Sequence, residues 1–321
     1  MAPASQPDRP RAGTLARLAA LLAVLAALGL VFGLLIRPWY LAWGSTASDR
    51  TVALPGDAII PNATAQETRA ITIHAPVDSV WPWVAQLGQD RGGFYSYDLL
   101  ENLVGCQMPT VDVLRPDKQW WALGDKLWMY PSTKAGGAGY ATLRVLVPGH
   151  AMAFGTHAAG TPLTAPEDGS WAFALQHVND STTRLLVRGR GAAGRSLLGV
   201  AFDRSIFEPM HFVMEKRMMT GIKQLSEGQD RGRMANHVQV VLWFLTFAMF
   251  IAGVESVFRR AAWRRALTGT AAAAIVFQIL TFGQPNYDVG ILLALIVATV
   301  LWWPVKPGSA LDGMLGGKRA A

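Results

Sequence analysis

Two groups of residues in the middle of the chain have side chains that could do chemistry or bind a ligand. The first group contains Arg91, Tyr95, Tyr97, Asp98 and Glu101. Such a set can present hydrogen-bond donors and acceptors to a polar group of a ligand. A carboxylate beside a tyrosine can also act as a general acid or base where water is excluded. The alternative is structural, with the arginine paired to a carboxylate and the aromatic rings filling the core.

The second group lies on one predicted helix, where methionines and a histidine recur. Methionine adapts to irregular apolar shapes, including those of ligands, although methionines at helical spacing are also typical of an ordinary core. Trp128 and Trp171 fall on predicted strands, where they either line a cavity or pack the core. The candidate ligand-binding residues are Arg91, Tyr95, Tyr97, Trp128, Trp171, Met210, His211, Met214 and Met218, and the candidate catalytic residues of an enzyme are Asp98, Glu101, Tyr95 and Tyr97.

Several classes of site have no signature in the sequence. The chain has no phosphate loop, dinucleotide fingerprint, zinc-protease motif or serine-protease spacing. We therefore predict no cofactor. The single cysteine, Cys106, excludes an intrachain disulfide and a cysteine-rich metal site. The six histidines lack metal-ligand spacing, so no metal is predicted: they are His74, His150, His157, His177, His211 and His237.

The composition points to a membrane protein. Hydrophobic residues make up 51% of the 321 residues and charged residues only 16%, whereas soluble domains carry about 25% charged residues. The charges cluster between residues 45 and 235. The net charge of +7 comes from basic residues that mostly flank apolar segments, which favours a role in membrane orientation over nucleic-acid binding.

Four apolar segments predict four transmembrane helices. Residues 15–36 contain about 20 apolar residues, enough to cross a bilayer core. This run is longer than that of a signal peptide, and Arg37 and aromatic residues follow it instead of a cleavage site, so we predict an uncleaved helix. The other predicted spans are residues 238–258, 266–282 and 289–303.

The distribution of arginine predicts the orientation. The link 258–265 holds four arginines, whereas the link 283–288 holds no lysine or arginine. Placing the arginine-rich link in the cytoplasm puts both termini there and the central domain on the extracytoplasmic side of a bacterial cytoplasmic membrane. Arg231 and Arg233 lie on the opposite flank and weaken this assignment. Apart from Arg17 near the start of the first span, Glu255 at the cytoplasmic end of the second is the one charged residue in the spans, which argues against a pore.

The central part reads as an α+β domain. A polar, turn-rich linker comes first, and then a strand, a helix, a short helix near Ser96, further strands and a long helix whose apolar residues recur every three or four positions. The polar residues of the long helix, among them Glu215 and Lys216, fall largely between the apolar ones. The predicted strands are 69–75, 124–130, 140–147, 151–156, 170–178 and 182–189, the last two joined in a hairpin by the turn Asn179-Asp180-Ser181, and the predicted helices are 77–87 and 201–227.

Three segments carry a resemblance to a known superfamily. Residues 69–102, 124–128 and 207–225 resemble the birch-allergen-like, polyketide-cyclase and lipid-transfer domains, also called SRPBCC or START-like, and especially their membrane-anchored bacterial members. The resemblance implies a helix-grip fold, in which an antiparallel sheet wraps around a long C-terminal helix and leaves an apolar cavity. The predicted organisation is 1–44, cytoplasmic N-terminus and first span; 45–68, linker; 69–228, helix-grip domain; 236–305, three spans; and 306–321, cytoplasmic tail.

Three functions fit this organisation. The first is binding or transport of a hydrophobic small molecule, lipid or polyketide-like, beside the membrane. The second is an enzyme of the cyclase or dehydratase type, and the third is an interaction module for another membrane protein. A mostly apolar cavity with a few polar groups favours binding. A buried carboxylate with a strongly shifted pKa favours the enzyme, and an exposed apolar patch favours the interaction module.

Overall fold

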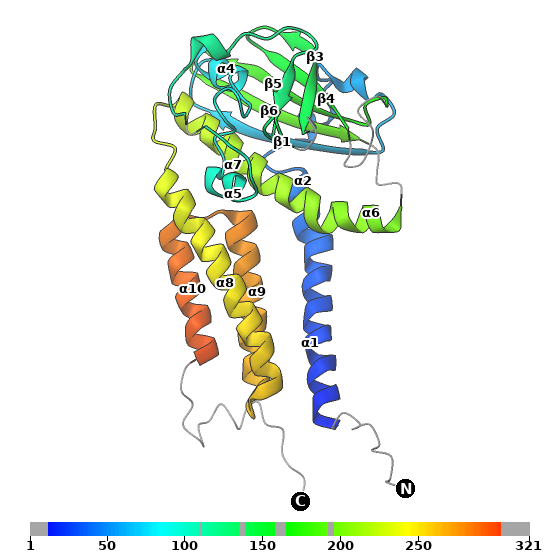
Figure 1. Cartoon of the computed structure of the whole chain (residues 1–321), viewed down its shortest axis with the longest axis vertical. Helices are drawn as coiled ribbons and strands as arrows, with labels where there is room; N and C mark the ends of the chain where they lie inside the picture. The colour runs from blue at the N-terminus through cyan, green and yellow to red at the C-terminus, as the bar shows by residue number, and fades with distance from the viewer. Residues whose placement is uncertain (1–11, 110, 135–138, 158–164, 192–195, 303–321) are drawn as a thin grey trace, which may run out of the picture. The chain divides into compact units, whose positions relative to one another are not determined.

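The computed structural model describes residues 12–109, 111–134, 139–157, 165–191 and 196–302. The chain forms two compact units (Figure 1). One unit consists of residues 1–34 and 234–321, and the other of residues 35–233. Each unit is considered by itself.

The first unit is helical, with small residues where its helices meet. It contains α1 (Ala12–Val31), most of α8 (Arg233–Arg259), α9 (Trp263–Gln278) with the π turn η6 (Ile279–Gly283), and α10 (Tyr287–Trp302). Helix α9 contacts both α1 and α10. A Cβ atom added to Gly253 on α8 would lie 2.5 Å from Oγ1 of Thr270 on α9. Glycine therefore lets these two helices approach closely, as is common between membrane helices.

Three helices are long and apolar enough to cross a membrane. They are Gly13–Leu41 with 29 residues, Arg233–Arg259 with 27 and Trp263–Gly283 with 21. The fourth predicted span, 289–303, corresponds to α10, an apolar helix of 16 residues, which is shorter than the ~20 residues that a perpendicular crossing needs. Residue 303 lies outside the described residues. The number of four crossings stays a prediction.

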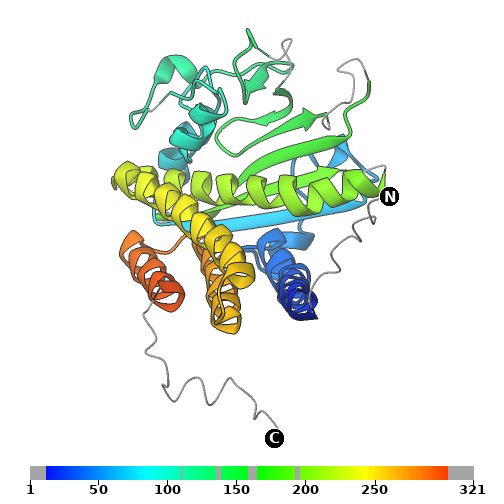
Figure 2. The same cartoon turned by 60° about the horizontal axis from the view of Figure 1, so that its bottom comes forward.

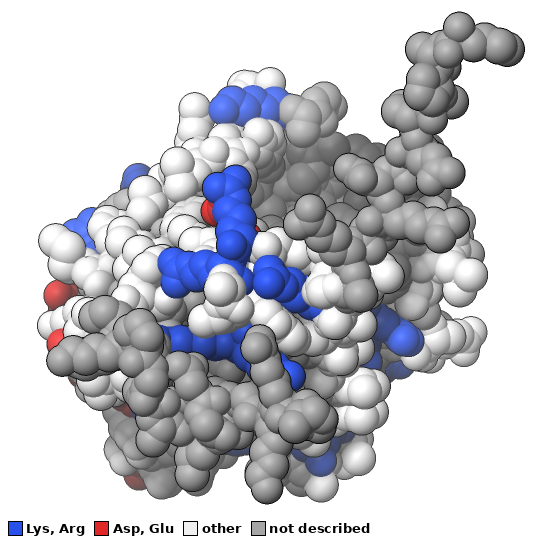
Figure 3. Space-filling view, turned by 90° about the horizontal axis from the view of Figure 1, so that it is seen from below, with Lys and Arg blue, Asp and Glu red and all other residues white. Residues whose placement is uncertain are grey.

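Arginines gather at one end of this helical unit. Arg17 on α1 donates hydrogen bonds to the carbonyl oxygens of Val257 and Phe258, at 3.2 and 2.8 Å. Arg260 donates to the carbonyl oxygen of Leu301 at 3.0 Å. Basic side chains near a helix C-terminus satisfy free carbonyl groups and suit the helix dipole. Figure 3 shows basic side chains gathered on this side with few acidic ones. Which side of a membrane this end occupies stays a prediction.

The second unit is built on one antiparallel sheet in the order β1-β6-β5-β4-β3-β2. All six predicted strands are present. Strand β1 begins at Ala65, earlier than predicted, and β2 is shorter than predicted. The Asn179-Asp180-Ser181 turn joins β5 and β6 as predicted. The strands are β1 (Ala65–Ile73), β2 (Lys126–Trp128), β3 (Tyr140–Val147), β4 (Ala151–Thr156), β5 (Gly169–Asn179) and β6 (Thr182–Gly191).

Helices cover the inner face of this sheet. Helix α4 packs against β5 and β6, and α7 packs against α4 and β1. Figure 2 shows α7 running along the sheet. The predicted α+β helix-grip architecture is therefore confirmed. The helices of this unit are α2 (Arg37–Leu41), α3 (Ala47–Thr51), α4 (Val77–Ala85), α5 (Asp98–Leu103), α6 (Leu197–Phe202) and α7 (Glu208–Ser226), with the single turns η2 (Asp57–Ile59) and η3 (Pro116–Lys118).

The long helix contains a π turn in front of a proline. Helix α6 continues through η5 (Asp203–Phe207) into α7, because the cap residues between them keep helical dihedrals. Pro209 has no backbone N–H to donate and its ring crowds the preceding turn, and a π turn is one way for a helix to accommodate such a break. The helix begins at Leu197 instead of the predicted residue 201.

The buried face of α7 differs from the predicted one. The apolar periodicity placed Phe207 and Met210 on the core face together with Met218, but the first two are exposed. Glu215 and Lys216, predicted to lie between the apolar residues, are buried. Periodicity failed here because partners from distant segments neutralise or cover these charges. The buried residues of α7 are Phe212, Val213, Glu215, Lys216, Arg217, Met218, Met219, Gly221 and Ile222.

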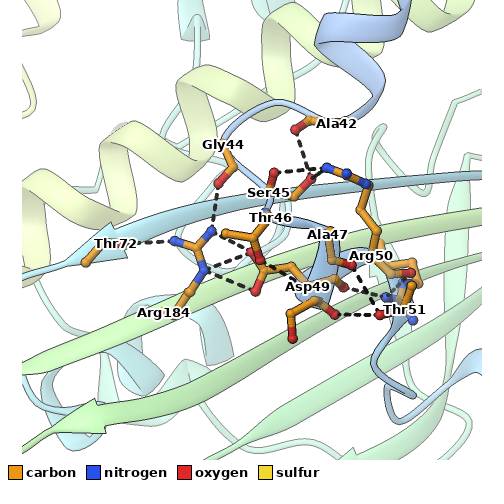
Figure 4. A network of polar contacts seen from close by, with 12 residues as sticks. Ala42, Gly44, Ser45, Thr46, Ala47, Asp49, Arg50, Thr51, Thr72 and Arg184 are labelled. Atoms are coloured by element: carbon orange, nitrogen blue, oxygen red, sulfur yellow. Dashed lines mark hydrogen bonds and ion pairs between the residues drawn. The ribbon is translucent and has the colours of Figure 1, made fainter.

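The predicted extended linker 45–68 contains a helix and covers the outer face of the sheet. Thr46 and Asp49 form a capping box at the start of α3. Arg184 of β6 pairs with Asp49 at 2.6 Å and donates to the Gly44 carbonyl oxygen at 2.7 Å (Figure 4). Burial alone would raise the pKa of Asp49, but hydrogen bonds from Arg184 and Thr46 lower it to about 2.

A second arginine of β6 extends this outer network. Arg188 is buried, pairs with Asp57 at 2.7 Å and donates to the carbonyl oxygens of Val52 and Asp49. A small apolar cluster lies beside it. The segment after α2 is therefore fastened to the sheet by two arginines from one strand. The cluster consists of Leu54, Ala70, Ala151, Ala174 and Leu186.

One close contact makes a clear prediction about stability. A Cβ atom added to Gly221 on α7 would lie 2.5 Å from the carbonyl oxygen of Tyr95. Alanine in place of glycine usually stabilises a helix by about 1 kcal/mol. We expect Gly221→Ala instead to destabilise the domain by about 1–3 kcal/mol, because α7 must move away from Tyr95. Hydrogen exchange of the β5 and β6 amides in the full-length protein measures this change. Stabilisation by alanine would show that the close packing does not matter.

Candidate functional site

The predicted site residues fall in several places of the domain. The guanidinium of Arg91 lies 3.6 Å from the centroid of the Trp121 ring. It donates hydrogen bonds to the carbonyl oxygens of Lys118 and Trp120, at 2.6 and 3.0 Å. Burial lowers its pKa. Arg91 therefore holds the segment before β2, and these contacts are with backbone carbonyl oxygens and an indole ring, not with the carboxylates Asp98 and Glu101 that were weighed as an alternative.

Tyr95 and Tyr97 lie in the core. The Tyr95 hydroxyl donates to the carbonyl oxygen of Trp83 at 3.2 Å, and the two rings meet edge to face at 5.8 Å. Both tyrosines are 1% exposed. Burial raises the pKa of both phenols, so neither is suited to give up a proton. Their positions agree with the structural interpretation of these aromatic residues.

Asp98 and Glu101 lie together beside a buried arginine. The side chain of Arg231 pairs with Asp98 at 2.9 Å and with Asp112 at 2.8 Å. Its own side chain is 1% exposed. Glu101 has a buried Oε2 atom with no hydrogen-bond partner among the described residues. Burial, together with the negative charge of Asp98, raises the pKa of Glu101 to about 8. Glu101 is thus largely protonated at neutral pH.

The long helix and the sheet enclose a second polar cluster. Arg69 of β1 pairs with Glu215 of α7 at 2.6 Å, and both side chains are 1% exposed. The indole N–H of Trp171 donates to the other oxygen of Glu215 at 2.8 Å. Arg69 also donates to the Tyr40 carbonyl oxygen at 2.9 Å. Burial would raise the pKa of Glu215, but the positive charge of Arg69 outweighs it and lowers that pKa.

His211 lies between two carboxylates at the margin of this cluster. Its Nε2 atom is 3.8 Å from Glu215, and its Nδ1 atom is 3.9 Å from Glu67. Both distances are longer than a normal hydrogen bond. His211 therefore interacts with Glu215 and Glu67 through charge alone, and only when its imidazole is protonated. The His211 side chain is 28% exposed. It is therefore the member of this cluster that an incoming molecule reaches most easily.

Aromatic rings lead from the surface to the interior at this place. The rings of Phe207 and His211 stack with centroids 5.8 Å apart. The ring centroids of His211 and Trp171 are 5.6 Å apart, and those of Trp171 and Phe94 are 6.2 Å apart. The exposed fraction falls from 57% at Phe207 to 8% at Trp171 and 7% at Phe94. We call Phe207, His211, Trp171 and Phe94 the aromatic path.

The remaining candidates are divided between core, surface and the far sheet edge. Met218 is buried in the core, and Met210 is exposed. Met214 is partly buried, and its carbonyl oxygen accepts a hydrogen bond from Ser96 at 2.9 Å. Trp128 lies on β2 against Tyr140 and Lys126. Among the predicted ligand-binding residues, Trp171 and His211 are in direct contact, with ring centroids 5.6 Å apart.

Sequence reasoning missed the charged partners Arg69, Glu67 and Glu215. One signal for Arg69 was present, because Arg69, Ile71 and Ile73 alternate on the same face of β1. That pattern directs Arg69 inward with two apolar residues. Nothing local in α7 indicated that Glu215 is its partner. Among the described residues, no three His, Cys, Asp or Glu side chains are grouped to hold a metal ion.

A comparison with solved structures finds several similar chains. The chain is similar to a crystal structure of a protein from Mesorhizobium loti, with 14% identity, covering 52% of this chain and 99% of that one, at a TM-score of 0.29. It is also similar to an AHSA1-like protein from Rhizobium etli (14% identity, 52% and 85% covered, TM-score 0.27). A third is a Polyketide_cyc-like protein from Corynebacterium glutamicum (12%, 50% and 91%, TM-score 0.23).

At these identities and TM-scores the likenesses assign no ligand, and the fold rests on the sheet and helices described above. No family model matches the chain. No curated protein matches it either.

The buried pair of Arg69 and Glu215 can be tested by mutation. We expect Glu215→Gln to destabilise the domain by about 3–5 kcal/mol, because it leaves the Arg69 charge buried without a counter-charge. The double variant Arg69→Met, Glu215→Leu should recover most of this loss, since it removes both charges. Hydrogen exchange of β1 and β6 in the full-length protein measures both. Equal losses in the single and double variants would contradict a charge-based explanation.

The raised pKa of Glu101 predicts a pH dependence. The pKa of Glu101 is about 8 in the folded protein, above its ordinary value of 4.5. The folded state therefore binds the carboxyl proton more tightly than the unfolded state does. The free energy of unfolding falls as the pH rises from about 4.5 to about 8. We expect Glu101→Gln, which resembles the protonated acid, to be more stable than the original protein above pH 8 and to lose this advantage in acid. Infrared absorption of the protonated carboxyl gives a direct check. The prediction would be contradicted if the free energy of unfolding changed with pH in the same way for Glu101→Gln and for the original protein.

Proposed function

We propose that this protein is anchored in a membrane and that its helix-grip domain binds a hydrophobic small molecule, lipid or polyketide-like, along the aromatic path. One observation carries the proposal. A row of rings runs from exposed Phe207 to buried Phe94 between the long helix and the sheet. Ligand sites are mostly apolar and aromatic with a few placed polar groups, and this path has that composition.

The chemistry of the path suggests how such a molecule is held. The apolar part of the ligand lies against the rings of Phe207 and Trp171, where each aromatic contact contributes about 0.5–1.5 kcal/mol. The polar end lies beside His211 and Glu67, which are partly exposed. Met214, one helical turn after His211 on α7, is partly buried, and a methionine side chain readjusts readily around a ligand.

The anchoring part of the proposal rests on the three helices that are long and apolar enough to cross a membrane. The arginines around the α8–α9 link favour a cytoplasmic position for that end. The helix-grip domain then lies on the extracytoplasmic side. A ligand that is poorly soluble in water suits a domain tethered beside a bilayer, because the lipid phase is where such a molecule accumulates.

A second candidate function is catalysis at Glu101. The observation in its favour is a buried carboxyl with an unpartnered oxygen atom and a raised pKa, which is a common property of catalytic acids. The tyrosines that the sequence suggested as its partners are in the core, where the Tyr95 hydroxyl already donates to Trp83. A cyclase or dehydratase reaction would therefore rely on Glu101 and Asp98 alone among the predicted catalytic residues.

The binding proposal is tested first on the full-length protein. Native mass spectrometry should detect a bound hydrophobic molecule, and a pyrene-labelled fatty acid serves as the binding probe. We expect Phe207→Ala to weaken binding of the probe by about tenfold, the equivalent of one aromatic contact. The matched control is Trp120→Ala, since Trp120 is 83% exposed and lies outside the aromatic path.

The outcomes separate the two candidate functions. Equal loss of affinity in Phe207→Ala and Trp120→Ala would show that the probe binds nonspecifically to exposed aromatic residues. A protein that is repeatedly empty and does not bind the probe would contradict the binding proposal. In that case Glu101→Gln becomes the informative variant, because it removes the acid of the catalytic alternative.

A further inference from the structure

The segment from Leu197 to Met210 is helical and exposes large apolar side chains. Leu197 is 92% exposed and Leu198 is 84% exposed. Large apolar patches on a protein surface usually mark the place where a membrane, a ligand or another protein binds. The exposed residues, which we call the apolar helix segment, are Leu197, Leu198, Phe202, Ile206, Phe207 and Met210.

The end of this segment is bonded to a candidate membrane span. Glu208 accepts two hydrogen bonds from Arg37, both at 2.8 Å, and one from the Tyr40 hydroxyl at 3.1 Å. Arg37 and Tyr40 belong to the last turns of the apolar helix Gly13–Leu41. A two-point contact between a guanidinium and a carboxylate fixes orientation as well as distance. The apolar helix segment is thus held beside the end of a span.

Aromatic packing reinforces this attachment. The ring of Phe212 on α7 stacks on Tyr40 at 5.2 Å and meets Trp39 at 5.6 Å. Trp39 itself is 45% exposed. Exposed tryptophan at the end of an apolar helix is typical of the membrane interface. Exposed apolar side chains therefore lie on both of the elements that these contacts join: Trp39 at the end of the span, and Phe207 and Met210 around the start of α7.

We infer that the apolar helix segment lies in the headgroup region of the same bilayer that α1 enters. This rests on the membrane anchoring in the proposed function and is independent of ligand binding. A helix in the interface buries apolar side chains about 5–10 Å deep. Its polar residues Asp203 and Arg204 have opposite charges, and Glu208 is already paired with Arg37, so apolar burial and not charge holds the segment there.

Site-specific fluorescent labelling tests this placement. Cys106, the single cysteine, is replaced by serine, and a cysteine is introduced at Leu198 or at Phe202. Each full-length variant carries an environment-sensitive dye and is placed in nanodiscs that contain one protein molecule each. We expect the dye emission to shift to shorter wavelength. Lipids with a quencher near the headgroup should remove most of that emission, while a water-soluble quencher should have little effect.

Two matched positions serve as controls. Phe244→Cys, in the middle of α8 and 57% exposed, reports on membrane insertion itself. At this position the quenching lipid carries its quencher in the middle of the acyl chain, because a bilayer core is about 30 Å thick. Leu123→Cys, 68% exposed and next to β2, reports on water. Strand β2 is one edge of the sheet and β1 is the other edge. Strand β1 lies at the end of the span, because its Arg69 donates to the carbonyl oxygen of Tyr40. The strand spacing puts β2 about 24 Å from β1.

The pattern of quenching at the three positions decides whether the apolar helix segment lies in the headgroup region. Lipid quenching at Leu198 and Phe244, but not at Leu123, supports the inference. Water quenching at Leu198 with lipid quenching at Phe244 overturns it while leaving membrane anchoring intact. Protection of Leu198 from both quenchers also overturns it and points to a protein covering the segment. Water quenching at Phe244 would remove the membrane anchoring on which the inference depends.

Discussion

The buried ion pair between Arg69 and Glu215 is the constraint on which the helix-grip domain depends. Arg69 reaches three elements at once, because it sits on β1, pairs with α7 and donates to the Tyr40 carbonyl oxygen at the end of α2. Two charges with 1% exposure are costly to bury and add little net stability compared with apolar side chains of the same size. We infer that the pair contributes specificity, because Glu215 must meet both Arg69 and the Trp171 indole for its charge to be compensated, which restricts the position of α7 on the sheet.

Local sequence patterns were sufficient for the elements of the fold but not for their charged connections. Alternation in β1 and the turn at Asn179 predicted strands and a hairpin that are present, because strand pairing follows from nearby residues. Helical periodicity gave the wrong buried face for part of α7. Glu215 and Lys216 are drawn inside by residues more than one hundred positions away, namely Arg69, Trp39 and Trp43. A pattern confined to one helix contains no information about such partners.

The candidate site shows the same division. Trp171 and His211 were candidates from the sequence, because Trp171 falls on a predicted strand and His211 on the methionine-rich predicted helix. Their joint position beside Glu67 and Glu215 depends on the pairing of β1, β6 and β5 and on the placement of α7. For Tyr95, the sequence suggested a site residue where the structure shows a core residue. Its chemical type suggested a site, yet a positive φ of 54° and contact with Gly221 place its ring in the core.

Polar ties also connect the sheet to the chain segment that leaves the first apolar helix. Arg184 and Arg188 hold residues 44–57 on the outer face, and Arg69 holds Tyr40 at the inner side. Arg37 and Tyr40 in turn hold Glu208 at the start of α7. These ties come from both faces of one sheet and leave the segment little freedom within the domain. The opening of the aromatic path at Phe207 is one residue from Glu208, so the contacts that fasten this segment also fix the start of α7 at that opening.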